Sequence, residues 1–340
     1  MKSVRIAING FGRIGRSFFR EAFGSPAGGT EFEIAAVNDL ADAKTLAYLL
    51  KYDSVYGRYK RAVEARDGSF AVEGKTVRVF MQKDPAALPW TDLGIDIVIE
   101  ATGLFASDKK SQAHLDAGAK RVVITAPASG EVTTALVGVN DERFKNPLPI
   151  TCNASCTTNS VAPVMAILLE HLGIKKSGMV TVHGYTGTQK LVDSPDQKDP
   201  RRGRAAAVNI VPSTTGAAEA VIQSIPQLEG KFEAVAIRVP TISGSYSVVS
   251  ALVGKKTNAE EINDMFSRAA QEPRWSKILK VTDEPLVSSD ILGEPYGAIV
   301  DLALTKVVDG DFVKVFSWYD NEAGYTATLI EHVRRVAGIV

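Results

Sequence analysis

The chain is poor in cysteine, in histidine and in net charge. Its 340 residues contain two Cys and four His, and 39 Lys and Arg balance 39 Asp and Glu. Two cysteines exclude a disulfide-rich scaffold, and zero net charge gives no reason to expect a nucleic-acid-binding or membrane-surface protein. A neutral chain also tends to associate, which favours an oligomer.

Long apolar runs are missing as well. No stretch approaches the roughly 18 uninterrupted apolar residues of a membrane span. The N-terminal sequence MKSVRIAINGFGRIG leads directly into a strand pattern, without the apolar core or cleavage site of a signal peptide. With 45% hydrophobic and 23% charged residues, we expect a soluble, cytoplasmic protein, and 340 residues suffice for two domains.

The first half of the chain alternates strand-like and helix-like segments. VRIAING, EIAAVND, KTVRVF, IDIVIEA and RVVITA read as strands, with IGRSFFREAF, AKTLAYLLKY and DKKSQAHLDAG as helices between them. This order predicts a Rossmann doubly wound parallel sheet.

The pattern changes after about residue 156. The run SVAPVMAILLEHLG reads as a helix, although Pro163 inside it conflicts with that prediction. Longer strand candidates then follow one another, among them GMVTVHGYT, FEAVAIRVP, YSVVSALVGK, GAIVDLALTKVV and DFVKVFSWY. The fold class that we expect is α/β, with the Rossmann sheet joined to an α+β domain that has a mixed, mostly antiparallel sheet.

A glycine-rich turn follows the first predicted strand. Gly10, Gly12 and Gly15 form G-x-G-x-x-G, and Asp39 ends the second strand 24 residues past Gly15. Glycine permits the tight turn and the close approach of the backbone to a pyrophosphate, and the helix N-terminus attracts the anion. An acidic side chain at Asp39 accepts hydrogen bonds from a ribose and repels a 2′-phosphate, which predicts NAD rather than NADP.

One of the two cysteines lies in polar surroundings. Cys156 occurs in NASCTTN, directly before the predicted helix, whereas Cys152 ends the apolar segment PLPITC. A helix N-terminus stabilises a thiolate, so we expect a lowered pKa and a nucleophilic role for Cys156. For Cys152 we expect a packing role, and we disfavour a redox pair because no Cys-x-x-Cys spacing is present.

Among the histidines, His183 is the candidate base. It ends a predicted strand in TVHGYTGTQ. When the Cys156 sulfur attacks an aldehyde, a neutral imidazole there can take the thiol proton and then the proton of the resulting hemiacetal. We expect His114 and His171 on helix surfaces and His332 on the last helix, each with a solvated or packing role.

Several residues are suited to hold anions. Thr186 follows His183 by three, Thr215 and Gly216 precede a predicted helix, and Arg238 lies in an apolar strand. A buried Arg needs a partner, which is either a structural carboxylate or a bidentate substrate phosphate.

In chain order, NGFGRIGR, LKYDSVYG, KDPAALPW, EATG, NASCTTN, RVPT and WYDNEAGY resemble phosphorylating glyceraldehyde-3-phosphate dehydrogenase over essentially the whole chain. The resemblance implies an NAD-binding Rossmann domain, 1–155 with the C-terminal helix 322–340, and a catalytic domain, 156–321. It also implies a homotetramer and a helix that accommodates Pro163.

The resemblance further implies how the site works. The Cys156 thiolate attacks the aldehyde of D-glyceraldehyde 3-phosphate, His183 accepts the proton while hydride passes to NAD, and inorganic phosphate releases 1,3-bisphosphoglycerate from the thioester. Thr186 and Arg238 hold the substrate phosphate. The attacking phosphate is held by Ser155, Thr157, Thr215 and Gly216, and NAD is contacted by Gly10, Gly12, Arg13, Ile14, Gly15, Asp39, Thr102 and Asn321. No metal takes part.

Some segments depart from the family pattern or leave alternatives open. Ala323 replaces a usual Trp, and ISGSYSVVSAL after RVPT leaves the local loop undefined. Erythrose-4-phosphate dehydrogenase shares NASCTTN and is the alternative activity; a binding protein on an inactive scaffold is disfavoured because Cys156, His183 and Arg238 are all present. The segment 189–204 matches a subunit-interface loop, and its basic residues Lys198, Arg201, Arg202 and Arg204 are better explained by that interface than by nucleic acid.

Overall fold

The computed structural model describes residues 3–24, 32–197 and 199–340. The chain divides into two compact units. Unit 1 comprises Met1–Ala135, Asp141–Ala154 and Leu329–Val340, and unit 2 comprises Leu136–Asn140 and Ser155–Thr328.

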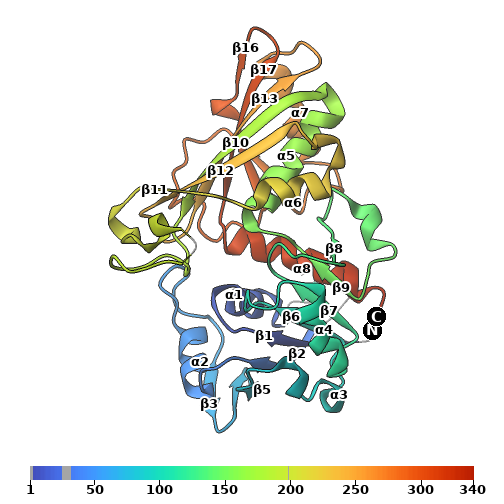
Figure 1. The fold of residues 1–340 in the computed structure, drawn as a ribbon, viewed down its shortest axis with the longest axis vertical. Coiled ribbons are helices and arrows are strands. Elements are labelled where there is room, and N and C mark those ends of the chain that lie inside the picture. Colours follow the sequence, from blue (N-terminus) through green and yellow to red (C-terminus); the bar gives the residue numbers. More distant parts are fainter. Residues whose placement is uncertain (1–2, 25–31, 198) are drawn as a thin grey trace. The chain divides into compact units, whose positions relative to one another are not determined.

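Nine strands of unit 1 form one sheet. They are β1 (Val4–Asn9), β2 (Phe32–Asn38), β3 (Val63–Arg66), β4 (Ser69–Val72), β5 (Lys75–Phe80), β6 (Ile97–Glu100), β7 (Arg121–Ile124), β8 (Thr133–Thr134) and β9 (Ile150–Cys152). Their order is β3-β4-β5-β2-β1-β6-β7-β9-β8 (Figure 1). All neighbours from β5 to β8 are parallel, which confirms the predicted Rossmann-type sheet.

The antiparallel hairpin β3–β4 at the edge of this sheet was not predicted. Its strands pair from Val63 to Arg66, and Asp67 and Gly68 form the turn, with Gly68 at φ +60°. Asp-Gly is a recognised hairpin signal, because its second residue adopts a positive φ at little cost. The surrounding residues are largely charged, so the apolar alternation that would have marked two strands is weak.

Helices and buried central strands build the rest of unit 1. The helices are α1 (Arg13–Ala22), α2 (Ala43–Lys51), α3 (Trp90–Leu93) and α4 (Asp108–Asp116), with 3₁₀ turns at Pro85–Ala87 and Asp141–Phe144. Asp42 caps α2 by accepting from the Thr45 N–H, and Ser107 caps α4 by accepting from the Lys110 N–H. Strand β6 is buried along its whole length, as expected of a strand covered on both faces.

Unit 2 contains a second, eight-stranded sheet. Its strands are β10 (Ile174–Gly184), β11 (Val211–Ser213), β12 (Phe232–Val239), β13 (Ser245–Val253), β14 (Leu279–Thr282), β15 (Ala298–Asp301), β16 (Lys306–Val308) and β17 (Phe312–Tyr319). The order is β11-β12-β10-β13-β17-β15-β14, and β16 pairs with β17. Only β10–β12 and β14–β15 are parallel among these pairs, which confirms the mixed, mostly antiparallel sheet. The predicted single strand GAIVDLALTKVV is interrupted by a 3₁₀ turn at Leu302–Leu304, which separates β15 from β16.

Helix α5 (Cys156–Leu172) lies against this sheet and is buried for most of its length. It continues through Pro163, as the family resemblance implied. The other helices are α6 (Ala217–Ser224), α7 (Ala259–Ala269) and α8 (Ala323–Ala337), with 3₁₀ turns at Pro200–Gly203, Ala206–Val208 and Pro226–Leu228. Over the described ranges, no helix combines the length and apolar character that crossing a membrane requires.

Candidate active site

The glycine-rich turn of unit 1 connects β1 to α1. Gly10 has φ +92°, and a Cβ there would lie 2.6 Å from the Thr102 backbone nitrogen. A Cβ on Gly15 would lie 2.2 Å from the Gly10 carbonyl oxygen. Gly12 is the N-cap of α1, has no side chain to cap the helix, and has no heavy atom within 4 Å of its hypothetical Cβ. Open space therefore lies beside the N-terminus of α1 at Arg13 and Ile14, where an anionic group is favoured.

Asp39 is held beside this turn. One of its carboxylate oxygens accepts from the Phe11 N–H at 2.8 Å, and the other accepts from the Ala41 N–H at 3.2 Å. The first contact joins the end of β2 to the glycine-rich turn, so the carboxylate and the turn predicted from sequence do come together.

A buried carboxylate that we did not predict supports Thr102. Glu100 accepts from the Thr102 N–H at 2.9 Å and from the Thr102 hydroxyl at 2.5 Å, and its other oxygen accepts from Asn9 Nδ2 at 2.6 Å. His114 Nε2 lies 3.0 Å from that same oxygen, while Trp90 Nε1 donates to His114 Nδ1 at 3.1 Å. Because the Trp90 donor occupies Nδ1, the proton of His114 is on Nε2 and points at Glu100. The expectation that His114 lies on a helix surface was wrong: it is fully buried and completes this network.

Cys156 and His183 meet in unit 2. Cys156 is the first residue of α5, and His183 lies near the end of β10. Their Sγ and Nε2 atoms are 3.4 Å apart. His183 shares a face of β10 with the buried Thr181 and Met179, because alternate residues of a strand point the same way. The register of β10 therefore carries the imidazole to the thiol.

His183 Nδ1 has two close neighbours. It lies 2.6 Å from the Gly184 carbonyl oxygen, which only accepts, and 2.5 Å from Arg238 NH1, which only donates, so the two contacts call for opposite tautomers. Arg238 NH1 also donates to the Gly184 oxygen at 3.3 Å. With the proton on Nδ1, the Nε2 lone pair faces Cys156, as a general base requires.

Electrostatics divide the roles of the pair differently from our expectation. Burial and then the positive charge of Arg238 lower the pKa of His183 to about 3, so the imidazole is neutral at pH 7. Desolvation raises the pKa of Cys156, whereas Arg238, the Thr157 hydroxyl and the N–H groups of Thr157 and Cys156 lower it by less. The expected net lowering by the helix N-terminus was therefore wrong, because desolvation outweighs it. The raised pKa leaves the Cys156 thiol protonated at pH 7, beside a neutral imidazole.

Tyr319 is a further member of this cluster that the sequence reasoning missed. Its hydroxyl lies 3.1 Å from the Thr157 hydroxyl and 2.7 Å from the Thr181 hydroxyl, and its ring contacts the His183 ring edge to face. Burial raises the pKa of Tyr319 to about 12, so it stays protonated. Its position in WYDNE, two residues before Asn321, was the available signal.

Arg238 has no carboxylate partner among the residues that the structure describes. It pairs with His183 on the neighbouring strand β10 and contacts His183 and Gly184. Of the two alternatives left open by the sequence, a structural ion pair is thus absent from the described part of the chain, and the guanidinium remains available to an anion.

The other residues predicted to bind phosphate form hydrogen bonds with residues nearby in the sequence. The Ser155 hydroxyl caps α5 by accepting from the Thr158 N–H at 3.1 Å. The Thr186 hydroxyl lies 3.0 Å from the Thr188 hydroxyl, and Thr215 accepts from the Ala217 N–H at 3.2 Å. Gly216 is the N-cap of α6. Of the four predicted for the attacking phosphate, only Thr157 approaches Cys156, with Oγ1 4.0 Å from Sγ.

Cys152 lies apart from the imidazole and the guanidinium that surround Cys156. It is fully buried at the end of β9, its sulfur lies 3.3 Å from the Thr134 hydroxyl, and desolvation raises its pKa. Both cysteines are free thiols. These surroundings agree with a packing role for Cys152.

Comparison with known proteins places both parts of the chain. Residues 4–108 match a family model described as "Glyceraldehyde 3-phosphate dehydrogenase, NAD binding domain", and residues 155–321 match the C-terminal domain of the same enzyme. Similar curated proteins, each named glyceraldehyde-3-phosphate dehydrogenase, come from Thermotoga maritima, Mycobacterium avium and Borreliella burgdorferi. The first is 51% identical over 328 residues, which cover 96% of this chain and 97% of that protein. The second is 48% identical over 337 residues (98% of each chain), and the third is 44% identical over 339 residues (98% of this chain and 99% of the other). This chain therefore belongs to the glyceraldehyde-3-phosphate dehydrogenase family, whose members are NAD-dependent oxidoreductases.

Proposed function

We propose that this protein catalyses the NAD-dependent oxidative phosphorylation of D-glyceraldehyde 3-phosphate to 1,3-bisphosphoglycerate through a Cys156 thioester. The observation that carries the proposal is the thiol–imidazole pair: Cys156 Sγ is 3.4 Å from His183 Nε2 at the start of α5. A nucleophile within reach of a neutral, correctly oriented base is the arrangement that covalent aldehyde oxidation requires. The family membership of the chain supplies the substrate.

The residues of unit 1 fit a dinucleotide. The open space at Gly12 and the uncapped N-terminus of α1 suit a pyrophosphate, and the blocked Cβ positions of Gly10 and Gly15 explain why glycine is needed there. We assign Arg13 and Ile14 to the pyrophosphate through their backbone N–H groups, Asp39 to the adenosine ribose, and Thr102 to the cofactor's neighbourhood. When bound, NAD supplies the hydride acceptor.

Cys156 and His183 carry the covalent steps. His183 Nε2 takes the thiol proton as Sγ attacks the aldehyde carbon and returns it to the former carbonyl oxygen, which forms a hemithioacetal and leaves the imidazole neutral again. The imidazole next accepts the proton of the hemithioacetal hydroxyl while the carbon is oxidised, which leaves a thioester on Sγ. Inorganic phosphate then attacks the thioester carbon. The C–S bond breaks, the acyl phosphate is released, and Sγ leaves as the Cys156 thiolate.

Substrate anions are assigned to the remaining polar groups. Arg238 and Thr186 hold the C3 phosphate, supported by the absence of a carboxylate partner for Arg238 within the described ranges. Ser155, Thr157, Thr215 and Gly216 receive the attacking phosphate. For Ser155 this contact is secondary, because its hydroxyl already caps α5.

An aldehyde and cofactor panel tests this function. We expect NADH formation from glyceraldehyde 3-phosphate that depends on phosphate, with NADP a poor substitute, and loss of turnover in Cys156→Ser. A faster, phosphate-independent rate on erythrose 4-phosphate would instead assign the chain to the alternative activity. Full turnover by Cys156→Ser would refute the covalent mechanism.

We also propose that the protein is a cytoplasmic homotetramer divided into an NAD-binding domain, 1–155 with 322–340, and a catalytic domain, 156–321. The match of the C-terminal family domain to residues 155–321 supports the division. The two free cysteines support a reducing compartment.

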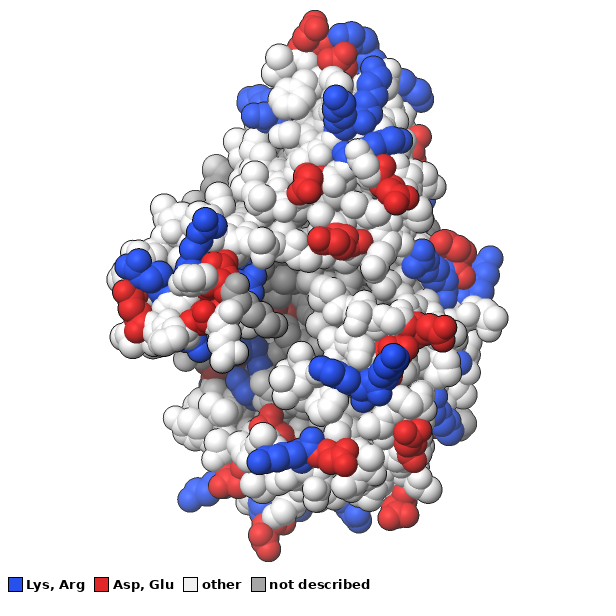
Figure 2. Space-filling model, in the orientation of Figure 1, with Lys and Arg blue, Asp and Glu red and all other residues white. Residues whose placement is uncertain are grey.

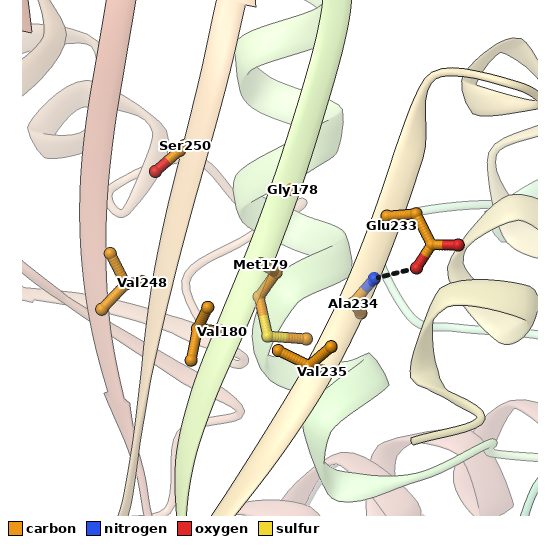
Figure 3. Close-up of a pocket in the computed structure, with 8 residues that line it drawn as sticks. All are labelled: Gly178, Met179, Val180, Glu233, Ala234, Val235, Val248 and Ser250. Atoms are coloured by element: carbon orange, nitrogen blue, oxygen red, sulfur yellow. Dashed lines mark hydrogen bonds between the residues drawn. The ribbon is translucent and has the colours of Figure 1, made fainter. Parts of the chain in front are cut away.

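A broad apolar face of the unit 2 sheet supports assembly. Register places Val235, Val180, Val248 and Phe316 in one row across four strands, on the face opposite the residues that contact α5. Val180 is 37% exposed and Val235 is 49% exposed, and Figure 3 shows the shallow groove around them. Tyr246 stacks on Phe316 in the same face. An exposed apolar sheet face of this extent fits a second copy of the chain.

The loop 189–204 and its flank add exposed apolar side chains. Leu191 and Val192 are 77% and 70% exposed, in keeping with an interface. Two of the basic residues have local partners: Arg204 pairs with Asp193 at 3.0 Å, and Arg202 donates to the Thr214 carbonyl at 3.1 Å. Lys198 lies outside the described residues. Basic and acidic side chains are interspersed on the face shown in Figure 2, which also argues against nucleic acid as the primary partner.

Light scattering after size-exclusion chromatography tests the assembly. A buried carboxylate disrupts an apolar interface, so Val180→Asp should release smaller species from the tetramer. Val308→Asp is the matched control, because Val308 is 57% exposed on β16, away from this row. An unchanged tetramer in Val180→Asp would refute the role of this face.

A further inference from the structure

Three consecutive residues in the unassigned segment ISGSYS point their donors at one atom. The Oδ1 atom of Asn321 accepts from the Ser243 hydroxyl at 3.3 Å, the Gly244 N–H at 3.1 Å and the Ser245 hydroxyl at 2.9 Å. The side chains of Ser243, Ser245 and Asn321 are all buried. The segment that departs from the family pattern therefore surrounds one amide oxygen with hydrogen-bond donors.

Backbone donors determine the direction of these bonds. The Gly244 N–H only donates, so the amide atom that it meets is the oxygen. The Gly184 N–H donates to Ser245 Oγ at 3.3 Å, so the Ser245 hydroxyl accepts there and sends its own proton to Asn321. The amide of Asn321 is thereby held in one of its two orientations.

The turn itself requires glycine to place this donor. Gly244 has φ +89°, a conformation that residues with a Cβ rarely adopt, and a Cβ would lie 2.7 Å from the Ser288 carbonyl oxygen. Asp320 secures the other side. The Ser243 hydroxyl has a single proton, which is shared between Asn321 Oδ1 at 3.3 Å and Asp320 Oδ1 at 3.0 Å, and this Asp320 oxygen also accepts from the N–H groups of Glu322 and Ala323. Both backbones that flank the Asn321 amide are thus fixed.

In this orientation Oδ1 is held by the donors, so Nδ2 is the part of the Asn321 amide that remains for a ligand. Its oxygen has three donors, whereas Nδ2 has no hydrogen-bond partner among residues 3–24, 32–197 and 199–340. A group with two N–H bonds recognises an acceptor such as a carbonyl oxygen, not another amide N–H.

We propose that Ser243 and Ser245 are positioning residues that fix the Asn321 amide as a hydrogen-bond donor, so that it recognises the carboxamide oxygen of the nicotinamide ring. The proposal rests on the proposed function and on the family resemblance, which implies that Asn321 contacts NAD. Ser245 also contacts the strand end that carries the base. It accepts from the Gly184 N–H, and the Gly184 carbonyl oxygen lies next to His183 Nδ1. One hydroxyl thus connects the strand end that carries the base with the amide that orients the cofactor.

Binding of cofactor analogues tests the donor direction. The 3-acetylpyridine analogue of NAD keeps the carbonyl oxygen and lacks the amide N–H bonds, whereas the thionicotinamide analogue replaces the oxygen by a poorly accepting sulfur. Calorimetric titration of the intact protein should show the acetylpyridine analogue binding within about threefold of NAD. The thionicotinamide analogue should bind about two- to tenfold more weakly, the range of one net hydrogen bond.

The variants separate positioning from folding. Ser243→Ala and Ser245→Ala should weaken NAD about two- to tenfold and narrow the NAD preference over the thionicotinamide analogue, because the amide is then free to turn. Asn321→Asp keeps an acceptor for all three donors but presents no N–H, so it should retain thermal stability and still lose that preference. Ser267→Ala on the surface of α7 is the matched control and should change neither quantity.

The outcomes are distinct from those of the activity assay. Tight NAD binding with unchanged analogue preference in both serine variants would overturn the positioning role, and so would wild-type preference in Asn321→Asp. Analogue binding is read without the aldehyde, so a failure to oxidise glyceraldehyde 3-phosphate would count against the proposed function alone. In steady state, Ser245→Ala should raise KM for NAD while leaving KM for the aldehyde within about twofold, which a general loosening of the site would not do.

Discussion

Replacing His183 by Asn removes the imidazole that contacts the nucleophile. In the described part of the chain, the Cys156 sulfur contacts His183 Nε2 at 3.4 Å and the Thr157 hydroxyl at 4.0 Å, and a hydroxyl is a poor base at neutral pH. The variant therefore has no substitute proton acceptor. We expect kcat to fall about 10²- to 10⁴-fold, the usual contribution of a general base, which corresponds to about 3–5 kcal/mol of activation free energy.

The direction of the pH effect follows from the two pKa shifts. The pKa of His183 is about 3, so the wild-type base is unprotonated throughout the neutral range. Desolvation raises the pKa of Cys156, so the resting thiol is protonated at neutral pH, and in the variant only the thiolate formed at high pH can react. Alkylation of Cys156 by iodoacetamide should accordingly slow at pH 7 in His183→Asn, and its pH profile should move upward.

Stopped-flow measurement of the first NADH turnover, together with the alkylation profile, checks both expectations. His171→Asn is the matched control, because this exposed residue lies in the last turn of α5, at the opposite end from Cys156. A first turnover within tenfold of wild type, or coincident alkylation profiles, would show that His183 is not the base.

Three further predictions concern stability and cofactor choice. Burial lowers the pKa of His332 from 6.5 to about 4, so stability is lost as pH falls through this window; His332→Gln should remove about 3 kcal/mol of the change seen in urea unfolding between pH 7 and 4, and an unchanged acid slope would contradict this. Asp39→Asn removes a charge that repels a 2′-phosphate, so the NADP/NAD ratio of kcat/KM should rise at least about tenfold, and a constant ratio would disprove the assignment. Glu100→Gln replaces one carboxylate oxygen by an amide N–H, which then faces either the donors of Thr102 or the donor of His114, so it should lower the free energy of unfolding by about 2–4 kcal/mol and weaken NAD binding in calorimetry, whereas wild-type values for both would show that the carboxylate is dispensable.

Local sequence patterns predicted most of the fold because most strands are buried in the structure as their apolar patterns indicate. The apolar runs that form β1, β2, β6 and β7 are buried on both faces, so the sequence signal for parallel strands is strong. Strand β3 lies at the sheet edge and is exposed from Glu64 to Arg66, and β4 is only four residues long, so neither strand shows a clear apolar alternation. The break at Leu302–Leu304 was missed for the opposite reason, since an apolar run conceals a change of direction.

The candidate site was predictable where one short segment contains the chemistry. The G-x-G-x-x-G turn combines glycines with a predicted helix start, and NASCTTN combines a reactive thiol with one. The structure places both segments at the start of a helix. Glu100, Tyr319 and the buried state of His114 were not predictable in this way. Their partners come from strands and helices far away in the sequence, so no local spacing relates them.

The amino-acid sequence by itself determined which residues are chemically competent: one thiol at a helix start, a few imidazoles, one arginine in an apolar strand and a glycine-rich turn. Only the tertiary structure decided which of them act together. The pairing of β10 with β12 and the packing of α5 on the sheet bring His183 and Arg238 to Cys156, leaving the other three histidines elsewhere. The tertiary structure also decided the sign of the Cys156 shift, because desolvation is the summed effect of neighbours that are distant in the chain, whereas the helix N-terminus is a local effect.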